Sequence, residues 1–386
     1  DEKLGEAVGE ALGEEAAAQE VAVLLGPGLN IQRSPLCGRD FEYFSEDPIL
    51  AGRMAAAYVR GIQKNGISAC PKHFAVNSQE LRRMASDSVL DERTLRELYL
   101  TGFEIVVKEA KPKTIMTSYN LINGTYANEN AHLLQDILRK DWGFDGAVVT
   151  DWGGSNDHAL GVKNGSTLEM PCPGGDSIRE LMKAVQGGKI SEADVDARLD
   201  EMLELVLSTH AAVEKAPRTF DAAAHHKLAR RAAAESIVLL RNEGGILPLK
   251  PNEKLAVIGD FAETPRYQGA GSSAVNALQV DTLLDSIKAD DSGITFVGYA
   301  SGFERQGAAD AEKLEEAVAL AKKADTVLLC LGLDELRESE GLDRSDMKLA
   351  ENQQQLLAAV AAVNPNVVVL LSAGAPVETP WAGQCR

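Results

Sequence analysis

The sequence has little positive charge and no long hydrophobic run. Its 386 residues contain 39 Lys and Arg against 58 Asp and Glu, which gives a net charge of −19 at pH 7. Such a surface repels nucleic-acid phosphates. No apolar run reaches the ~18 residues that a transmembrane helix needs, and no signal peptide is visible in the acidic run that opens the sequence. We therefore expect neither a nucleic-acid partner nor membrane insertion.

Cysteine is also scarce, and its pattern excludes two common uses. The five cysteines are scattered, odd in number and never in C-x-x-C spacing: Cys37, Cys70, Cys172, Cys330 and Cys385. This pattern predicts free thiols in a reducing compartment, and hence a cytoplasmic protein, instead of a disulfide framework or a zinc site. No His, Asp or Glu cluster has convincing metal-ligand spacing either. We expect no metal and no cofactor.

The first half of the chain alternates short apolar runs with amphipathic segments. Strands are predicted at residues 21–31, 67–74, 114–120 and 146–152, and helices at 47–66, 91–110 and 129–143. Four strand–helix alternations in series indicate an α/β fold with a parallel sheet. The apolar content of 45% is ample for large cores.

Each predicted strand of this half ends in polar residues: Asn30 and Arg33, Lys72 and His73, Tyr119 and Asn120, and Asp151 and Trp152. Parallel α/β folds build their sites at the carboxyl ends of their strands. The alternative role for Asp151, as a helix cap, is disfavoured because "GGSNDH" follows it instead of an apolar helical run. We therefore predict a site at this edge of the sheet.

A second compositional unit follows a helical stretch at 177–215. Apolar, β-branched runs at 254–261, 294–300, 325–332 and 367–374 alternate with helical segments, which predicts a second parallel α/β layer structure. We place the first domain at 1–210, a linker at 211–225 and the second domain at 226–386.

The residues at the strand ends suit a polyhydroxylated ligand. Cations, an imidazole and aromatic rings accompany the carboxylate of Asp151: Arg39, Lys72, Arg83, His73, Tyr119 and Trp152. The second domain adds an acidic loop, "ELRESEGLDR" (335–344), just past a predicted strand. One carboxylate from each domain is what acid-assisted cleavage of a glycoside requires. Taken one at a time, these residues have ordinary explanations, such as loop ion pairs and core packing; together they favour a site.

Several long motifs, in order along almost the whole chain, resemble glycoside hydrolase family 3 in its β-glucosidase-like branch. They are "NIQRSPLCGRDFEYFSEDP", "PKHFAVNSQELRR", "IMTSYNLINGTY", "DWGFDGAVVTDWGG" and "LLRNEGGILPL", followed by "YQGAGSSAV" and "ESEGLDR". The resemblance implies a retaining hydrolase with a (β/α) barrel-like first domain, followed by an α/β sandwich domain that carries the acid/base loop.

The resemblance also implies residue roles. Asp151 matches the nucleophile, and Glu340 matches the general acid/base. Glu338, two residues earlier, is the competing candidate, and we prefer Glu340, the Glu that precedes Gly341 in the acidic loop. The sugar subsite would be lined by Arg39, Lys72, His73, Arg83, Met116, Tyr119 and Trp152. We expect Asp343 and Arg344 to hold the acidic loop without taking part in the chemistry.

These roles imply an exo-acting retaining β-glycosidase. The activity that we favour is that of a β-glucosidase, which releases terminal β-D-glucose by double displacement. The expected partner is a β-glucoside or oligosaccharide, and a homo-oligomer is compatible with the sequence. A β-xylosidase, a broad β-glycosidase and a catalytically idle sugar-binding fragment stay open as alternatives. The family's upstream loop, whose Asp grips sugar hydroxyls, has no counterpart here, so we expect the barrel-like domain to be N-terminally incomplete.

Overall fold

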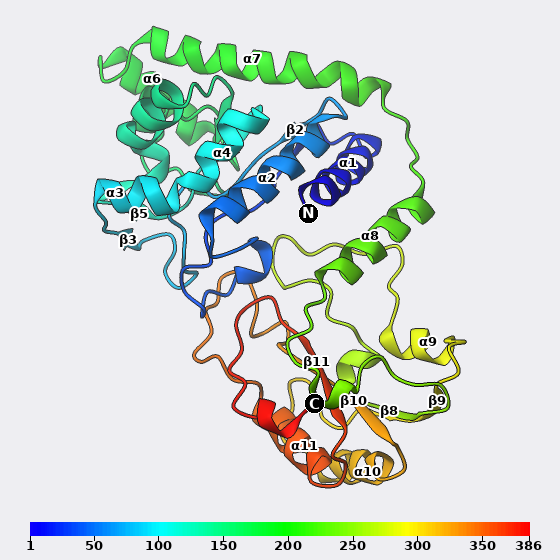
Figure 1. Cartoon of the computed structure of the whole chain (residues 1–386). Coiled ribbons are helices and arrows are strands. Elements are labelled where there is room, and N and C mark those ends of the chain that lie inside the picture. Colours follow the sequence, from blue (N-terminus) through cyan, green and yellow to red (C-terminus); the bar gives the residue numbers. More distant parts are fainter. The chain divides into compact units, whose positions relative to one another are not determined.

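The computed structural model describes residues 1–386, which form two compact units (Figure 1). The first unit comprises Asp1–Ser34 and Glu42–Ser236, and the second comprises Pro35–Phe41 and Ile237–Arg386. The seven residues Pro35–Phe41 therefore pack with a part of the chain about 200 residues away in sequence, which the sequence did not indicate. The predicted domain limits, 1–210 and 226–386, stay a prediction about how the chain divides into domains.

The first unit contains short parallel strands in the predicted order. β1 (Val23–Leu24) pairs with β2 (Ser68–Ala69), and β4 (Thr114–Met116) pairs with β7 (Ala147–Val149). Parallel bridges beyond the strand ends, such as Gly28 with Lys72 and Phe74 with Thr117, continue these alignments. The parallel arrangement of the prediction is confirmed.

The strands are much shorter than the predicted runs, for a reason that is visible in the sequence. Pro27 follows β1 and Pro71 follows β2, and a proline has no N–H to donate to a strand neighbour. Beyond these prolines the alignment continues through separate backbone hydrogen bonds, such as that from the Leu29 N–H to the Lys72 carbonyl at 2.8 Å. The prolines thus interrupt the regular ladder of β1 and β2 without ending the alignment.

The helices of the first unit are α1 (Glu2–Ala18), α2 (Pro48–Gln63), α3 (Glu92–Thr94), α4 (Thr101–Ala110), α5 (His158–Asn164), α6 (Gly175–Gln186), α7 (Glu192–Lys215) and α8 (Ala222–Ser236). The predicted helix 91–110 is interrupted by a π-helical turn, η2 (Leu95–Tyr99), and the predicted helix 129–143 is the π-helix η4 (His132–Asp141). The predicted helical stretch 177–215 is two helices, because the Gly187–Gly188 pair ends α6 and a capping box at Ser191 starts α7. The predicted linker 211–225 contains the end of α7 and the start of α8.

A small sheet that the sequence did not indicate follows the strand end at Asn120. It has the order β3 (Asp87–Ser88), β5 (Leu121–Ile122) and β6 (Thr125–Tyr126), and β5 and β6 form a hairpin. Its two turn residues, Asn123 and Gly124, both have positive φ, as a two-residue hairpin turn requires.

One histidine joins α8 to α1. Both ring nitrogens of His225 face carboxylates: Nδ1 lies 2.7 Å from Glu15 Oε1, and Nε2 lies 3.2 Å from Glu14 Oε2. A neutral imidazole can donate only one hydrogen bond, so only the imidazolium satisfies both contacts. Burial opposes the charged ring, but the hydrogen bonds to Glu15 and Glu14 raise the pKa of His225 above its ordinary value.

The contact of His225 makes the stability of the first unit depend on pH. Because the folded pKa lies above the unfolded one, the contribution is complete at pH values below about 6.5 and is lost as the pH rises through the folded pKa. Relative to wild type, His225→Gln should lower the free energy of unfolding by on the order of 1–2 kcal/mol at pH 5.5 and by much less at pH 9. Urea unfolding at both pH values checks this. His210→Gln, at a histidine whose side chain is 70% exposed, is the control; an equal loss at both pH values would contradict the assignment.

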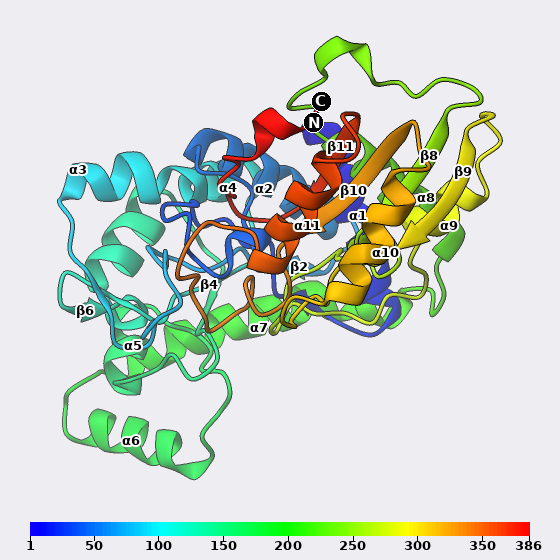
Figure 2. The same ribbon diagram turned by 90° about the horizontal axis from the view of Figure 1, so that it is seen from below.

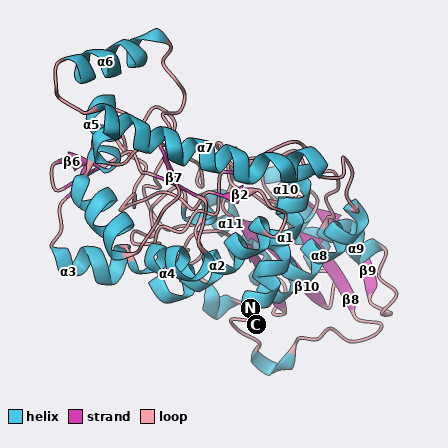
Figure 3. Ribbon diagram, turned by 90° about the horizontal axis from the view of Figure 1, so that it is seen from above, coloured by secondary structure: helices cyan, strands magenta, loops and turns pink.

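The second unit has one parallel four-stranded sheet, as predicted. Its strands are β8 (Lys254–Ile258), β9 (Thr295–Ala300), β10 (Thr326–Gly332) and β11 (Val367–Ser372), in the order β11-β10-β8-β9 (Figures 2 and 3). Every pairing is parallel. Helices α9 (Leu283–Lys288), α10 (Ala311–Ala321) and α11 (Glu351–Ala361) alternate with the strands. The acidic loop directly follows β10, the strand at the middle of the sheet.

None of the helices combines the length and the hydrophobicity that crossing a lipid bilayer would require.

Candidate active site

In the first unit, the structure brings His73 and Asp151 together. His73 follows β2 and Asp151 follows β7, and the distance from His73 Nε2 to Asp151 Oδ2 is 3.6 Å. Both residues are buried, with exposed fractions of 1% and 8%. The other carboxylate oxygen of Asp151, Oδ1, accepts the backbone N–H of Trp152 at 2.7 Å. The predicted convergence of these two strand ends is therefore present.

The backbone of His73 is clamped by the end of another strand segment. The side chain of Asn30 accepts the His73 N–H at 2.7 Å and donates to the His73 carbonyl at 2.9 Å. The far side of the ring meets Tyr43, whose hydroxyl oxygen lies 3.2 Å from Nδ1. The imidazole thus has a fixed place and orientation.

An aromatic and cationic group lies next to Asp151. The Arg83 guanidinium stacks over the Tyr119 ring, 4.7 Å from its centroid, and Glu80 holds Arg83 by an ion pair of 2.8 Å. The Tyr119 hydroxyl donates to the carbonyl of Trp152 at 2.8 Å. The Trp152 side chain itself is 61% exposed. An exposed indole beside a buried carboxylate is the surface that a sugar ring can stack on.

Lys72 and Met116 complete the set predicted for the first domain. Lys72 is half-buried, and both its charge and that of Asp151 act on the Cys70 thiol, which places them in one neighbourhood. Met116 is buried in an apolar cluster with Cys70 and Val149. Burial raises the pKa of Cys70 to about 12, so this thiol stays protonated and is no nucleophile at neutral pH.

Arg39 lies in the second compact unit, together with the acidic loop. It belongs to the segment Pro35–Phe41, is 1% exposed, and its guanidinium lies 3.8 Å from Glu340 Oε1. The other oxygen of Glu340, Oε2, accepts the backbone N–H of Ser272 at 2.7 Å. The side chain of Glu340 is 16% exposed. The carboxylate is thus oriented by two donors while its surface stays accessible.

The two candidate carboxylates of the acidic loop have different environments. Glu338 is completely buried and forms an ion pair with Arg266. It also accepts the backbone N–H of Gly374 at 2.9 Å. Arg266 in turn donates to the carbonyl of Leu333 at 3.1 Å. These contacts pair the Glu338 carboxylate with buried groups of the second unit. Little of the carboxylate is therefore accessible to a substrate.

The acidic loop is packed directly on the segment Pro35–Phe41. Asp343 accepts the N–H of Gly38 at 3.1 Å, and the backbone N–H of Arg344 donates to the carbonyl of Leu36 at 2.8 Å. The Arg344 side chain donates to the carbonyl of Pro376 at 2.7 Å. These contacts confirm that Asp343 and Arg344 hold the loop in place. Burial, together with the charge of Glu338, raises the pKa of Asp40 to about 7 in the same segment.

Gly38 permits this packing because it has no side chain. A Cβ atom there would lie 1.6 Å from the Leu342 carbonyl oxygen and 2.5 Å from that of Ser339. Gly38→Ala must therefore displace the backbone that carries Glu340, and we expect it to lower the free energy of unfolding by about 1–3 kcal/mol or more. The displacement should also lower turnover at temperatures where the protein is folded.

Thermal unfolding and turnover, measured on the same samples of Gly38→Ala, check this expectation. Gly383→Ala is the matched control, since a Cβ there meets nothing within 4 Å. Wild-type turnover by a fully folded Gly38→Ala protein would show that the packing of this segment is not needed for the site.

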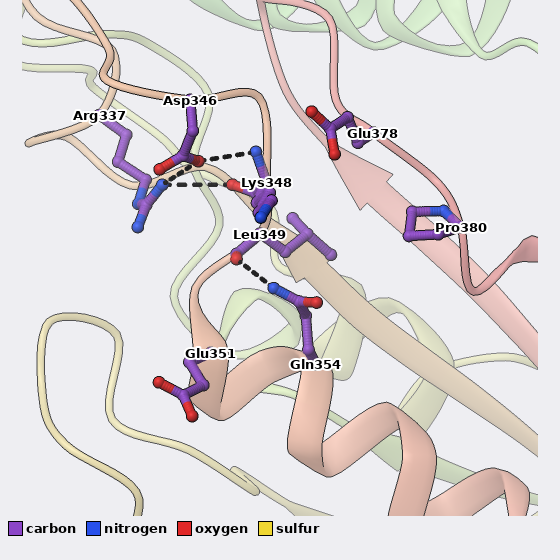
Figure 4. Close-up of a pocket in the computed structure, with 8 residues that line it drawn as sticks. All are labelled: Arg337, Asp346, Lys348, Leu349, Glu351, Gln354, Glu378 and Pro380. Carbon is purple, nitrogen blue, oxygen red and sulfur yellow. Dashed lines mark hydrogen bonds and ion pairs between the residues drawn. The ribbon is translucent and has the colours of Figure 1, made fainter.

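A separate cavity of about 590 Å³ lies in the second unit and contains none of the predicted site residues (Figure 4). Its lining is Arg337, Asp346, Lys348, Leu349, Glu351, Gln354, Glu378 and Pro380. Arg337 reaches Asp346 at 3.5 Å and the carbonyl of Lys348 at 3.2 Å. Arg337 and Asp346 of this lining form an ion pair, and none of the eight lining residues is aromatic, so the cavity offers no platform for a sugar.

Comparison with known families decides the family. Residues 1–205 match the glycosyl hydrolase family 3 N-terminal domain, and residues 237–386 match the C-terminal domain of the same family. The chain belongs to glycosyl hydrolase family 3. Its fold class is the predicted one, a barrel-like α/β unit followed by an α/β sandwich unit.

Individual relatives of this family 3 chain agree. It is 46% identical over its whole length to thermostable β-glucosidase B of Acetivibrio thermocellus, and 45% identical over 98% of its length to an exo-α-(1→6)-L-arabinopyranosidase of Bifidobacterium breve. It covers 51% of each of these proteins, so it spans about half the length of the curated relatives that it matches. The crystal structure of a β-glucosidase from Bifidobacterium adolescentis superposes with a TM-score of 0.95 at 44% identity, covering all of this chain and 56% of that one.

Sequence reasoning missed several residues around the candidate site. Tyr43 contacts His73, Glu80 holds Arg83, and Ser272 binds Glu340. Tyr43 and Glu80 lie within quoted motifs, "GRDFEY" and "NSQELRR", where an aromatic or an acid beside predicted ligands could have been considered as support. Ser272 lies 68 residues before Glu340, and no local pattern signals that contact.

Proposed function

We propose that this family 3 chain acts as an exo-acting retaining β-glycosidase, with β-glucosides as its preferred substrates. The observation that carries the proposal is the buried carboxylate of Asp151 at a strand end, beside His73 and below an exposed Trp152. A carboxylate held next to a polar ring and an indole platform is suited to attack a sugar bound by its hydroxyls. The family relatives, named as glycosidases, support the same reaction class.

The proposed mechanism is a double displacement. Asp151 attacks the anomeric carbon and forms a C–O bond while the bond to the leaving oxygen breaks, and Glu340 donates its proton to that oxygen. Water then attacks the anomeric carbon, Glu340 takes a proton from the water, and the bond to Asp151 breaks. Retaining enzymes need their two carboxyl groups ~5–5.5 Å apart in the working site.

The contacts within each unit support these roles. Glu340 is the more accessible of the two candidate carboxylates, whereas Glu338 is paired with Arg266. We propose that the sugar is bound by the residues predicted from the sequence: Arg39, Lys72, His73, Arg83, Met116, Tyr119 and Trp152. Arg39 would then bind close to the acid, because it lies 3.8 Å from Glu340.

Two relatives of nearly equal identity are named for different activities, β-glucosidase and exo-α-(1→6)-L-arabinopyranosidase. The described contacts bind hydroxyls and a ring face, which glucose and other pyranosides share. We favour glucose because β-glucosidase is also the name of the superposed crystal structure.

A panel of nitrophenyl glycosides tests the proposal on this chain. We expect saturable turnover of the β-glucoside, with slower turnover of β-xyloside and α-L-arabinopyranoside and none of β-N-acetylglucosaminide. A faster β-xyloside would assign a β-xylosidase. Saturable glucose binding without turnover above the Asp151→Ala variant would favour a sugar-binding module, and neither binding nor turnover would overturn the proposal.

We also propose a cytoplasmic location and no cofactor. All five cysteines are free, and Cys37, Cys70, Cys330 and Cys385 are buried thiols, which supports a reducing compartment. Fractionation of cells that express the protein would test the location, and recovery in an extracytoplasmic fraction would contradict it.

Full turnover after treatment with a chelator would support a reaction that needs no metal ion, as proposed for the double displacement. A homo-oligomer is also compatible with the proposal, and sedimentation of the purified chain would reveal it.

A further inference from the structure

Tyr43 touches the candidate site through His73, and neither the proposed mechanism nor the predicted residue set uses it. Its exposed fraction is 6%, and its hydroxyl oxygen lies 3.2 Å from His73 Nδ1. The two rings meet edge to face, with centroids 6.3 Å apart and an angle of 78°. On the opposite side of the imidazole, Nε2 lies 3.6 Å from Asp151 Oδ2. The three side chains therefore form a row in which His73 is the middle member.

The place of Tyr43 in this row is fixed from several sides. Its backbone carbonyl accepts the side-chain N–H of Gln32 at 3.0 Å. Its ring packs against Gly28, where an added Cβ would lie 3.0 Å from the ring edge. Asn30 holds the backbone of His73 on both its N–H and its carbonyl. These contacts fix the backbone from which both rings project, and the packing on Gly28 holds the Tyr43 ring.

The two tautomers of a neutral imidazole have opposite consequences in this row. With the proton on Nε2, Nδ1 accepts the Tyr43 hydroxyl proton and Nε2–H points to the carboxylate of Asp151. With the proton on Nδ1, the Tyr43 hydroxyl accepts it, but the lone pair of Nε2 faces that carboxylate, which is repulsive. A hydroxyl that donates to Nδ1 therefore stabilises the tautomer whose Nε2–H faces Asp151.

We propose that Tyr43 is a positioning residue whose hydroxyl selects the Nε2–H tautomer of His73 and so keeps a hydrogen-bond donor directed at Asp151. At 3.6 Å the contact to Asp151 is longer than a hydrogen bond, and contacts of this kind tighten when a substrate is bound. The part of the inference that concerns catalysis rests on the proposed role of Asp151 as nucleophile. The assignment of the His73 tautomer does not depend on the role of Asp151 as nucleophile.

Nitrogen NMR of the histidine rings tests the tautomer directly. In ¹⁵N-histidine-labelled protein the six histidines give resolvable ring signals, and the His73 pair is the one that disappears in His73→Gln. We expect a non-protonated Nδ1 and a protonated Nε2 in wild type. In Tyr43→Phe the two shifts should move toward each other as the Nδ1–H form becomes populated. Tyr58→Phe, a hydroxyl deletion on α2, should leave the His73 signals unchanged.

Kinetics separate positioning from a purely structural role. Tyr43→Phe keeps the ring that packs on Gly28, so its melting temperature should change little. We expect kcat for a β-glucoside to fall roughly tenfold or more, with KM nearly unchanged because the sugar contacts remain.

Three outcomes decide the proposal, and one concerns only the proposed function. Unchanged His73 shifts in Tyr43→Phe, or both nitrogens protonated in wild type at neutral pH, would overturn the tautomer assignment. An altered tautomer with unchanged kcat would confine Tyr43 to a structural role and overturn the positioning role. A wild-type protein without glycosidase activity would contradict the proposed function while leaving the NMR result interpretable.

Discussion

Asp151→Ala is expected to abolish turnover of a β-glucoside and leave the fold intact. The proposed nucleophile forms the covalent bond to the anomeric carbon, and removing such a group costs roughly five to six orders of magnitude in kcat. The expected loss in the free energy of unfolding is small by comparison. The contacts that the side chain gives up include the hydrogen bond from the N–H of Trp152, and a hydrogen bond to a charged group is worth on the order of 1–3 kcal/mol.

External azide turns this loss into a positive test. A small anion can enter the space left by the carboxylate and attack the anomeric carbon of a substrate with a good leaving group. The product of a β-glucoside would then be the α-glucosyl azide, of inverted configuration, which NMR identifies. Asp145→Ala is the matched control, because Asp145 is an exposed aspartate at the opposite end of β7. Wild-type-like turnover in Asp151→Ala would exclude Asp151 as the nucleophile.

The position of Asp151 could be predicted because it depends on strong local signals. Apolar runs such as 146–150, separated by amphipathic helices, specify parallel strands, and the carboxyl ends of parallel strands meet at one edge of a sheet. His73 and Asp151 are adjacent in the structure for this reason. The lengths of β1 and β2 were less predictable, because prolines 27 and 71 interrupt their regular ladder within otherwise apolar runs.

The place of Arg39 could not be predicted in this way. The segment Pro35–Phe41 has no periodicity, and its position depends on contacts with residues about 300 positions later, such as that of Gly38 with Asp343. A glycine that is needed for backbone packing looks the same in a sequence as a glycine in a turn. The polar strand ends therefore indicated the first part of the site, whereas the support for Glu340 depends on non-local packing that only coordinates reveal.

The two carboxylates of the acidic loop lie between these cases. The family resemblance favoured Glu340, but alternation of side-chain direction places residues two apart on the same face and could not indicate that Glu338 and Glu340 differ in environment. Nor did the sequence indicate that Arg266, 72 positions before Glu338, would be the partner of the buried one. That contact turns the preference for Glu340 into an experiment that can separate the two residues.

Glu340→Ala is expected to affect substrates according to their leaving groups. Cellobiose hydrolysis requires protonation of a sugar alkoxide, so loss of the acid should reduce it severely, by roughly 10²–10⁴-fold. A dinitrophenyl glucoside leaves as a stable phenolate, so its glycosylation step should be spared. Deglycosylation then becomes limiting, since no base activates water. Azide should accelerate that step and yield β-glucosyl azide, of retained configuration.

Glu338→Ala should give a different pattern, because that side chain balances a buried guanidinium. Removing it leaves Arg266 uncompensated, with an exposed side-chain fraction of only 5%, and such losses cost about 3–5 kcal/mol of stability. The melting temperature should therefore fall, and both substrates should lose activity in the same proportion, without azide rescue. Glu340→Ala should lose less stability than Glu338→Ala, since the Glu340 side chain is 16% exposed and its 3.8 Å contact with Arg39 is longer than a hydrogen bond. If the leaving-group dependence and the retained azide product appear in Glu338→Ala instead, Glu338 is the acid, and the buried ion pair with Arg266 must open during the reaction.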